Sequence, residues 1–130
     1  MKTTHEITAE QFATKHGIKL TVIGTPEYKV HFPGDKVARY VFKLRLSRNG
    51  KSYTFSFGQS INEGSNEPTM YDVIACLTKY DVGDFENFCG EFGYDIDSRT
   101  AERTYKAVLK EWKAVDRLFS DILEEMNEIQ

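Results

Sequence analysis

The stretch that decides the fold is YVFKLRLSRNGKSYTFSF, which spans residues 40–57. Apolar and polar residues alternate on both sides of Asn49-Gly50, and this dipeptide is the preferred loop of a two-residue type I′ hairpin. The sequence therefore predicts two antiparallel strands that share one apolar face. That face consists of Tyr40, Phe42, Leu44, Leu46, Tyr53, Phe55 and Phe57.

The opposite face of the hairpin is cationic and rich in hydroxyl groups. It carries Arg39, Lys43 and Arg45 on the first strand and Ser52, Thr54 and Ser56 on the second. An antiparallel sheet with one covered face and one face toward solvent has this pattern. We therefore expect helices to cover the aromatic face alone.

The segment before the hairpin predicts a short helix and further strands. Thr8 to Gln11 fits a capping box, with Phe12 as the anchor of a helix that ends at Gly17. Residues 18–23 alternate and contain β-branched side chains, which favours a strand, and residues 27–32 are a weaker strand candidate. The sheet is therefore expected to have three or four antiparallel strands.

Beyond residue 69 the apolar residues recur with a helical period. Met70, Val73, Ile74 and Leu77 form one stripe, and a second short helix is expected from Asp84. The whole chain is thus predicted to be a single α+β domain, because 130 residues are enough to bury one core. Residues 1–60 hold the strands and a short N-terminal helix, and residues 69–130 are helical.

The last quarter of the chain has a heptad pattern of apolar residues. The seam consists of Tyr105, Val108, Trp112, Val115, Phe119, Ile122, Met126 and Ile129. A continuous helix over residues 98–128 would be about 45 Å long, whereas a compact chain of this size is about 36 Å across. The helix must therefore overhang, pair with a second copy, or break. Ser120-Asp121 resembles a second N-cap, which favours a break at residues 119–121.

The net charge of −3 hides a division between the two halves. Residues 1–60 carry ten Lys and Arg against four acids, and residues 61–130 carry seven against sixteen. Such an asymmetry indicates either a charged partner or two layers that complement each other. Both interpretations remain open at this point.

Nothing in the sequence indicates a catalytic, metal or cofactor site, so we expect no enzyme and no cofactor. The two cysteines, Cys76 and Cys89, have no histidine in their local context and are expected to be reduced, buried side chains. Asp95 and Asp97 begin like a calcium loop, but Thr100 stands where such a loop needs glycine, so we expect these acids to cap the long helix.

The sequence also contains no sign of membrane association. No apolar run approaches ~18 residues, and the N-terminal segment lacks the apolar stretch of a signal peptide. A cytoplasmic protein is therefore expected.

An acidic, aromatic segment is the leading candidate for binding a partner protein. It contains Tyr80, Asp81, Asp84, Glu86, Glu91, Tyr94 and Asp95. Acids around aromatic anchors steer a protein onto a basic site, where the anchors become buried. The alternative is that the aromatic rings are core and the acids form the rim of that core.

Two other binding modes are open. Arg39, Lys43, Arg45, Arg48 and Lys51 are candidates for contacts to the phosphates of a nucleic acid, although the hairpin offers no aromatic residues on that face for base stacking. The heptad seam is the candidate interface of a homodimeric assembly module.

The segment from Tyr71 to Arg99 contains three short motifs: Tyr71-Asp72-Val73, Phe88-Cys89 and Gly93-Tyr94-Asp95. Together with Glu111-Trp112 and the acidic end of the chain, they resemble a family of small bacteriophage and prophage accessory proteins. The resemblance covers roughly residues 36–130. It implies a phage accessory protein in the cytoplasm of a bacterial host. By analogy with other phage proteins of this size, it implies an inhibitor of host defence, most concretely an anti-CRISPR protein that binds a CRISPR effector.

Overall fold

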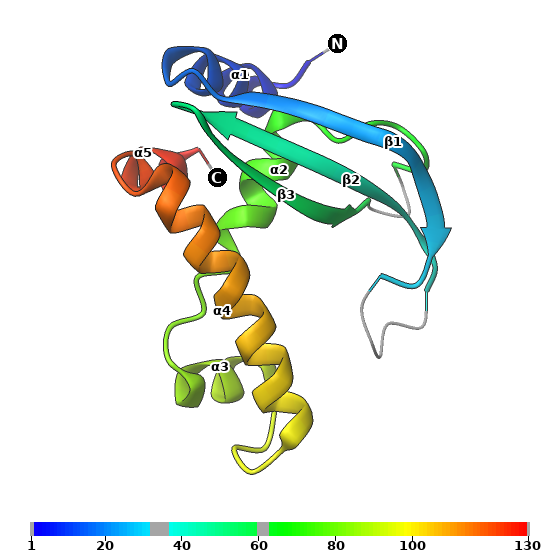
Figure 1. Cartoon of the computed structure of the whole chain (residues 1–130), viewed down its shortest axis with the longest axis vertical. Helices are drawn as coiled ribbons and strands as arrows, with labels where there is room; N and C mark the ends of the chain where they lie inside the picture. Colours follow the sequence, from blue (N-terminus) through cyan, green and yellow to red (C-terminus); the bar gives the residue numbers. More distant parts are fainter. Residues whose placement is uncertain (1, 32–36, 60–62, 130) are drawn as a thin grey trace.

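The computed structural model describes residues 2–31, 37–59 and 63–129. Within these residues the strands form a three-stranded antiparallel sheet in the order β1-β2-β3, with helices against one face (Figure 1). The elements are α1 (Thr4–Lys15), β1 (Lys19–Lys29), β2 (Arg39–Arg48), β3 (Lys51–Gly58), α2 (Met70–Thr78), α3 (Phe85–Phe92), α4 (Arg99–Phe119) and α5 (Leu123–Glu128). The predicted α+β class is confirmed.

The β2–β3 hairpin forms as its sequence predicts. Asn49 and Gly50 have φ values of 53° and 76°, as a type I′ turn requires. Leu44 lies opposite Phe55 and Leu46 opposite Tyr53, so the apolar residues of both strands share one buried face.

Strand β1 joins the two strand candidates before the hairpin into one element. It pairs with β2 from Lys19 to Lys29, and its register shifts between Ile23 and Glu27. Gly24 adopts a φ of 68° inside this irregularity, a conformation that glycine reaches without strain. The strand ends at Lys29, and residue 32 of the second candidate lies outside the described residues.

The N-cap of helix α1 lies five residues earlier than predicted, at Thr3 instead of Thr8. Its N-cap is Thr3, whose side chain accepts a hydrogen bond from the Glu6 backbone, while the Glu6 carboxylate accepts one from the Thr3 backbone. Thr8 lies inside the helix, where its hydroxyl donates to the carbonyl of Thr4. The predicted N-cap at Thr8 is therefore wrong, because the earlier capping box has a charged acceptor. Phe12 is buried as expected.

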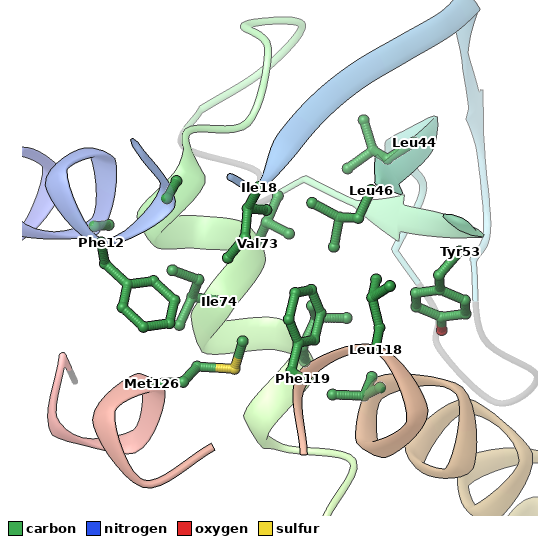
Figure 2. Packing of buried hydrophobic residues seen from close by; sticks show 14 of the residues in the cluster. Phe12, Ile18, Leu44, Leu46, Tyr53, Val73, Ile74, Leu118, Phe119 and Met126 are labelled. Atoms are coloured by element: carbon green, nitrogen blue, oxygen red, sulfur yellow. The ribbon is translucent and has the colours of Figure 1, made fainter. Parts of the chain in front are cut away.

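The main core lies between the aromatic face of the sheet and the helices that cover it (Figure 2). Phe12 of α1, Ile74 of α2, Phe119 of α4 and Met126 of α5 all pack into this cluster with Leu46 of β2. The hydroxyl of Tyr53 also donates to the Glu111 carboxylate, which ties β3 to α4. Burial raises the pKa of Glu111.

The helix that carries the C-terminal heptad seam is broken, and its first part extends beyond the body of the molecule. Helix α4 ends at Phe119 and α5 begins at Leu123, which confirms the predicted break. The predicted cap at Ser120 is wrong, because the N-cap of α5 is Ile122 and no side chain caps it. The N-terminal half of α4 extends beyond the sheet (Figure 1).

The apolar residues of the seam pack against other parts of the same chain. Val115, Phe119, Ile122, Met126 and Ile129 are buried in the main core. These side chains therefore do not offer a free face for a second copy, and the structure gives no support to a homodimer through the seam.

A second, smaller core lies between α3 and the overhanging part of α4. Its buried residues are Val82, Phe88, Cys89 and Ala101, with Phe85, Tyr105 and Val108 packed against them. We call residues 81–108 the α3–α4 lobe. It projects from the body of the molecule, away from the sheet (Figure 1).

Candidate protein-binding site

Local hydrogen bonds build the α3–α4 lobe. Asp84 caps α3 by accepting from the backbone of Asn87 at 2.8 Å, and the Asn87 side chain donates to the carbonyl of Val82 at 2.9 Å. The Tyr105 hydroxyl donates to the carbonyl of Gly83 at 3.1 Å, which joins α4 to the loop before α3. The lobe thus holds its own shape with few contacts to the sheet.

Phe88 is the centre of an aromatic cluster in this lobe. Its ring centroid lies 5.1 Å from that of Phe92, 5.4 Å from that of Tyr94 and 5.5 Å from that of Tyr105. Phe88 itself is buried, whereas Phe92 and Tyr94 lie on its outer side, toward solvent. Contact with Phe88 therefore holds exposed rings in place.

The end of the lobe exposes large apolar side chains. Phe92 is 53% exposed, Tyr94 is 36% exposed and Ile96 is 54% exposed. These residues, which we call the tip, fall within five consecutive positions, from the last residue of α3 into the loop before α4. Exposed apolar patches on a small protein often mark interaction sites, so these three neighbouring positions are a candidate for one.

Acidic side chains surround the tip along the sequence. Residues 81–98 contain six acids and no lysine or arginine. All six are exposed: Asp81, Asp84, Glu86, Glu91, Asp95 and Asp97. Asp84 and Asp95 also accept backbone hydrogen bonds, the latter from Asp97 at 3.0 Å, so part of this charge stabilises the lobe itself.

The structure brings six of the seven predicted partner-binding residues onto this lobe and separates one of them. Tyr80 lies just after α2, partly buried against the main core, with the Cys76 thiol 3.7 Å from its hydroxyl. Burial is the main cause that raises the pKa of Tyr80. Tyr80 is therefore a packing residue rather than part of an exposed binding surface.

Sequence reasoning missed two of the three tip residues. Phe92 follows Phe88 by four positions, a helical spacing that places both on one face and predicts that both are buried. The helix ends directly after Phe92, so this side chain lies at the edge of the small core and remains exposed. Ile96 belongs to no periodic pattern, and only its apolar character between two acids signals an exposed anchor.

The two thiols have no feature of reactive cysteines. Burial raises the pKa of Cys76 and of Cys89, and Asp95 adds to the effect at Cys89. A raised pKa disfavours the thiolate, which is the nucleophilic form. Among the described residues, no three His, Cys, Asp or Glu side chains are grouped so that they could hold a metal ion.

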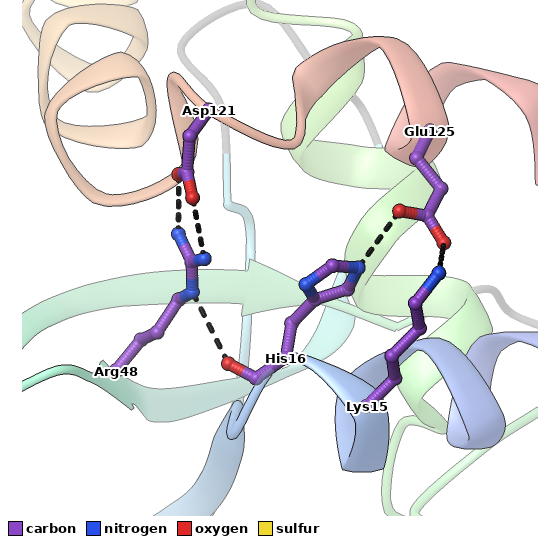
Figure 3. A network of polar contacts seen from close by, with 5 residues as sticks. All are labelled: Lys15, His16, Arg48, Asp121 and Glu125. Carbon is purple, nitrogen blue, oxygen red and sulfur yellow. Dashed lines mark hydrogen bonds and ion pairs between the residues drawn. The ribbon is translucent and has the colours of Figure 1, made fainter.

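Arg48 does not belong to the basic surface predicted for nucleic acid. It lies on the covered face of β2, is buried, and contacts both carboxylate oxygens of Asp121 at 2.6 and 2.8 Å (Figure 3). It also donates to the backbone carbonyls of Leu118 and His16. The hydrogen bonds from Arg48 lower the pKa of Asp121 to about 2.

A second ion pair lies beside this one. Glu125 of α5 accepts from Lys15 at 3.0 Å and contacts the ring of His16 at 2.8 Å (Figure 3). These two contacts lower the pKa of Glu125. The polar network therefore attaches α5 to α1 and to the end of β2.

No protein-family model, curated protein or solved structure matches this chain. No helix in the described part of the chain is long and apolar enough to cross a membrane.

Proposed function

We propose that this chain is a non-enzymatic binding protein that docks onto a cationic surface of a partner protein through the tip of the α3–α4 lobe. The observation that carries this proposal is the exposure of Phe92, Tyr94 and Ile96 on a projecting lobe whose flanking segment holds six acids and no lysine or arginine.

The two components of this surface have different roles in binding. The apolar tip supplies the anchors, since aromatic side chains that become buried at the centre of an interface carry much of the binding energy. The surrounding acids accelerate the encounter with a positively charged surface and select against acidic partners. The projection of the lobe suits insertion into a concave site on the partner.

The partner class that fits best is a protein that handles nucleic acid, because such proteins present cationic channels. Together with the resemblance to phage accessory proteins, this makes an inhibitor of bacterial defence the specific proposal. The chain would act in the cytoplasm of the host as an anti-CRISPR protein and occupy the nucleic-acid surface of a CRISPR effector.

The first test is capture of partners by the tagged protein from host lysate, with and without nuclease, followed by affinity measurements on the purified effector. Two variants address the lobe: Phe92→Ser with Ile96→Ser removes the anchors, and Glu86→Lys with Glu91→Lys reverses charge without removing a helix cap. The matched control is Glu63→Lys with Glu67→Lys, which changes the net charge equally at exposed positions outside the lobe.

We expect the anchor variant to lose about tenfold or more in affinity, which corresponds to the loss of one or two interface anchors. The charge variant should bind more slowly, and the difference from wild type should shrink as salt rises. The control should bind like wild type. If both lobe variants retain wild-type affinity for a nuclease-resistant partner, the lobe is not the binding surface.

A further inference from the structure

The open face of the sheet is a second surface, and the proposed role of the lobe does not involve it. Strand register places nine residues of this face in three rows across the sheet. The rows are Lys19, Ser47 and Ser52; Thr21, Arg45 and Thr54; and Ile23, Lys43 and Ser56. None of these residues is acidic, and two cations lie next to each other along the central strand.

Most of these side chains are accessible. Lys43 and Arg45 are exposed on β2, as are Lys19 and Thr21 on β1. The facing hydroxyl residues of β3, Ser52, Thr54 and Ser56, are exposed as well. The helices pack on the other face of the sheet (Figure 1), so they do not cover these rows.

The spacing of these groups suits a chain of phosphates. Lys43 and Arg45 are two positions apart on one strand, so their Cα atoms are separated by about 7 Å. This separation is comparable with that of successive phosphates in one nucleic-acid strand. A guanidinium binds a phosphate with two parallel hydrogen bonds, and an ammonium adds a compact positive charge. Hydroxyl groups are common additional donors to phosphate oxygens.

We propose that the open face of the sheet binds the phosphate backbone of a nucleic acid, with Lys43 and Arg45 as the central contacts. None of the nine residues in the three rows is aromatic, so bases cannot stack on them, and binding depends on backbone charge rather than on sequence. This surface works independently of the lobe and extends the proposed function to a second ligand class.

The composition of the face favours a nucleic acid over another protein. Specific protein interfaces usually have an apolar or aromatic centre, whereas the only large apolar residue in these rows is the half-buried Ile23. The same reason opposes docking of a second copy through its tip, since Phe92 and Ile96 need an apolar recess to become buried.

The test uses the full chain and a fluorescent DNA duplex of about 20 base pairs, with binding followed by anisotropy from about 50 mM to about 200 mM salt. The variant Lys43→Gln with Arg45→Gln removes the central contacts. The matched control, Lys110→Gln with Lys113→Gln, removes the same charge from exposed positions on α4. Thermal melting verifies that each variant is folded.

We expect affinity to fall with salt with a logarithmic slope of about −3, as release of counterions from about three phosphates predicts. The sheet variant should lose about tenfold in affinity or more and the control much less. Amide resonances of Thr21, Arg45 and Thr54 should shift on titration with the duplex.

Three results would overturn the proposal. Equal losses of affinity in both variants would mean that only net charge matters. Absence of binding at about 50 mM salt would exclude nucleic acid as the ligand of this face. The third is self-association in sedimentation that the sheet variant abolishes while the duplex stays unbound, which would assign the face to a second copy. None of these results depends on whether the lobe binds a protein.

Discussion

Arg48 joins parts of the chain that lie far apart in the sequence. From the end of β2 its guanidinium donates to the carbonyls of His16 and Leu118 and to the carboxylate of Asp121. A buried guanidinium is tolerated only when its donors are paired, because transfer of a charge from water into the protein interior costs free energy. These contacts therefore fix where α4 ends and how the chain turns into α5.

Replacement of Asp121 by asparagine tests this network. The pKa of Asp121 in the folded chain is about 2, below its ordinary value of 3.8, so the carboxylate stabilises the fold fully above pH 3.8. This contribution is lost as the pH falls from 3.8 to about 2. Asp121→Asn should therefore lower the melting temperature at neutral pH, and its difference from wild type should shrink over that acid range.

The measurement is thermal melting followed by circular dichroism at several pH values. Asp116→Asn, at an exposed position of α4, is the control and should melt like wild type. A difference between Asp121→Asn and wild type that stays constant down to a pH of about 2 would contradict the role of the ion pair.

At the scale of elements, the signals that predicted structure correctly are short-range. Asn49-Gly50 and the alternation beside it determine the hairpin, because a two-residue loop leaves one register for both strands. The predicted N-cap of α1 at Thr8 is wrong for an equally local reason. Two overlapping capping patterns compete there, and the one at Thr3 and Glu6 makes both of its hydrogen bonds.

Two glycines in different elements give a matched pair of substitutions. Gly50 has a φ of 76° in the hairpin turn, so Gly50→Ala should destabilise the chain by about 1 kcal/mol, measured by urea unfolding. Gly90 lies within α3, and a Cβ at this position would meet no atom within 4 Å.

Gly90→Ala should consequently stabilise α3 by up to about 1 kcal/mol, because alanine loses less backbone freedom in a helix. Hydrogen exchange of the α3 amides should slow by a factor of about five. Faster exchange in this variant would mean that α3 is not a regular helix in solution.

At the scale of the whole molecule, the chain is built around two cores of unequal size. Among the described residues the main cluster holds nineteen buried side chains and the cluster of the α3–α4 lobe holds four. Segments with few buried contacts open at a lower free energy than the main core. We therefore expect the lobe, which carries the proposed protein-binding tip, to be the less stable part of the protein.

Phe88→Ala tests this expectation. Removal of a buried phenylalanine costs about 3–5 kcal/mol, which is large for a cluster of four buried residues. The lobe should unfold while the body stays folded. Circular dichroism should show less helix, whereas the urea midpoint reported by Trp112, which packs against the main core, should stay near that of wild type. Equal shifts in both signals would show that the two cores unfold together.

The division of charge between the two halves also has its explanation at this scale. Arg48 with Asp121 and Lys15 with Glu125 pair a cation of the first half with an acid of the second, so part of the asymmetry is internal complementation. Part of the remaining charge is also unevenly placed. Lys19, Lys43 and Arg45 are exposed on the open sheet face, and six exposed acids lie in residues 81–97 of the lobe.

The sequence by itself determined the elements whose signals lie within a few residues: the hairpin, its covered and open faces, the helical second half and the break after Phe119. Only the tertiary structure decided the placement of side chains whose surroundings come from distant segments. Arg48 shares the cationic character of its neighbours but is buried because Asp121 reaches it. Phe92 shares the spacing of a core residue but is exposed because α3 ends directly after it, at the edge of the small core. At these two positions burial depends on what another part of the chain brings close, which local periodicity does not report.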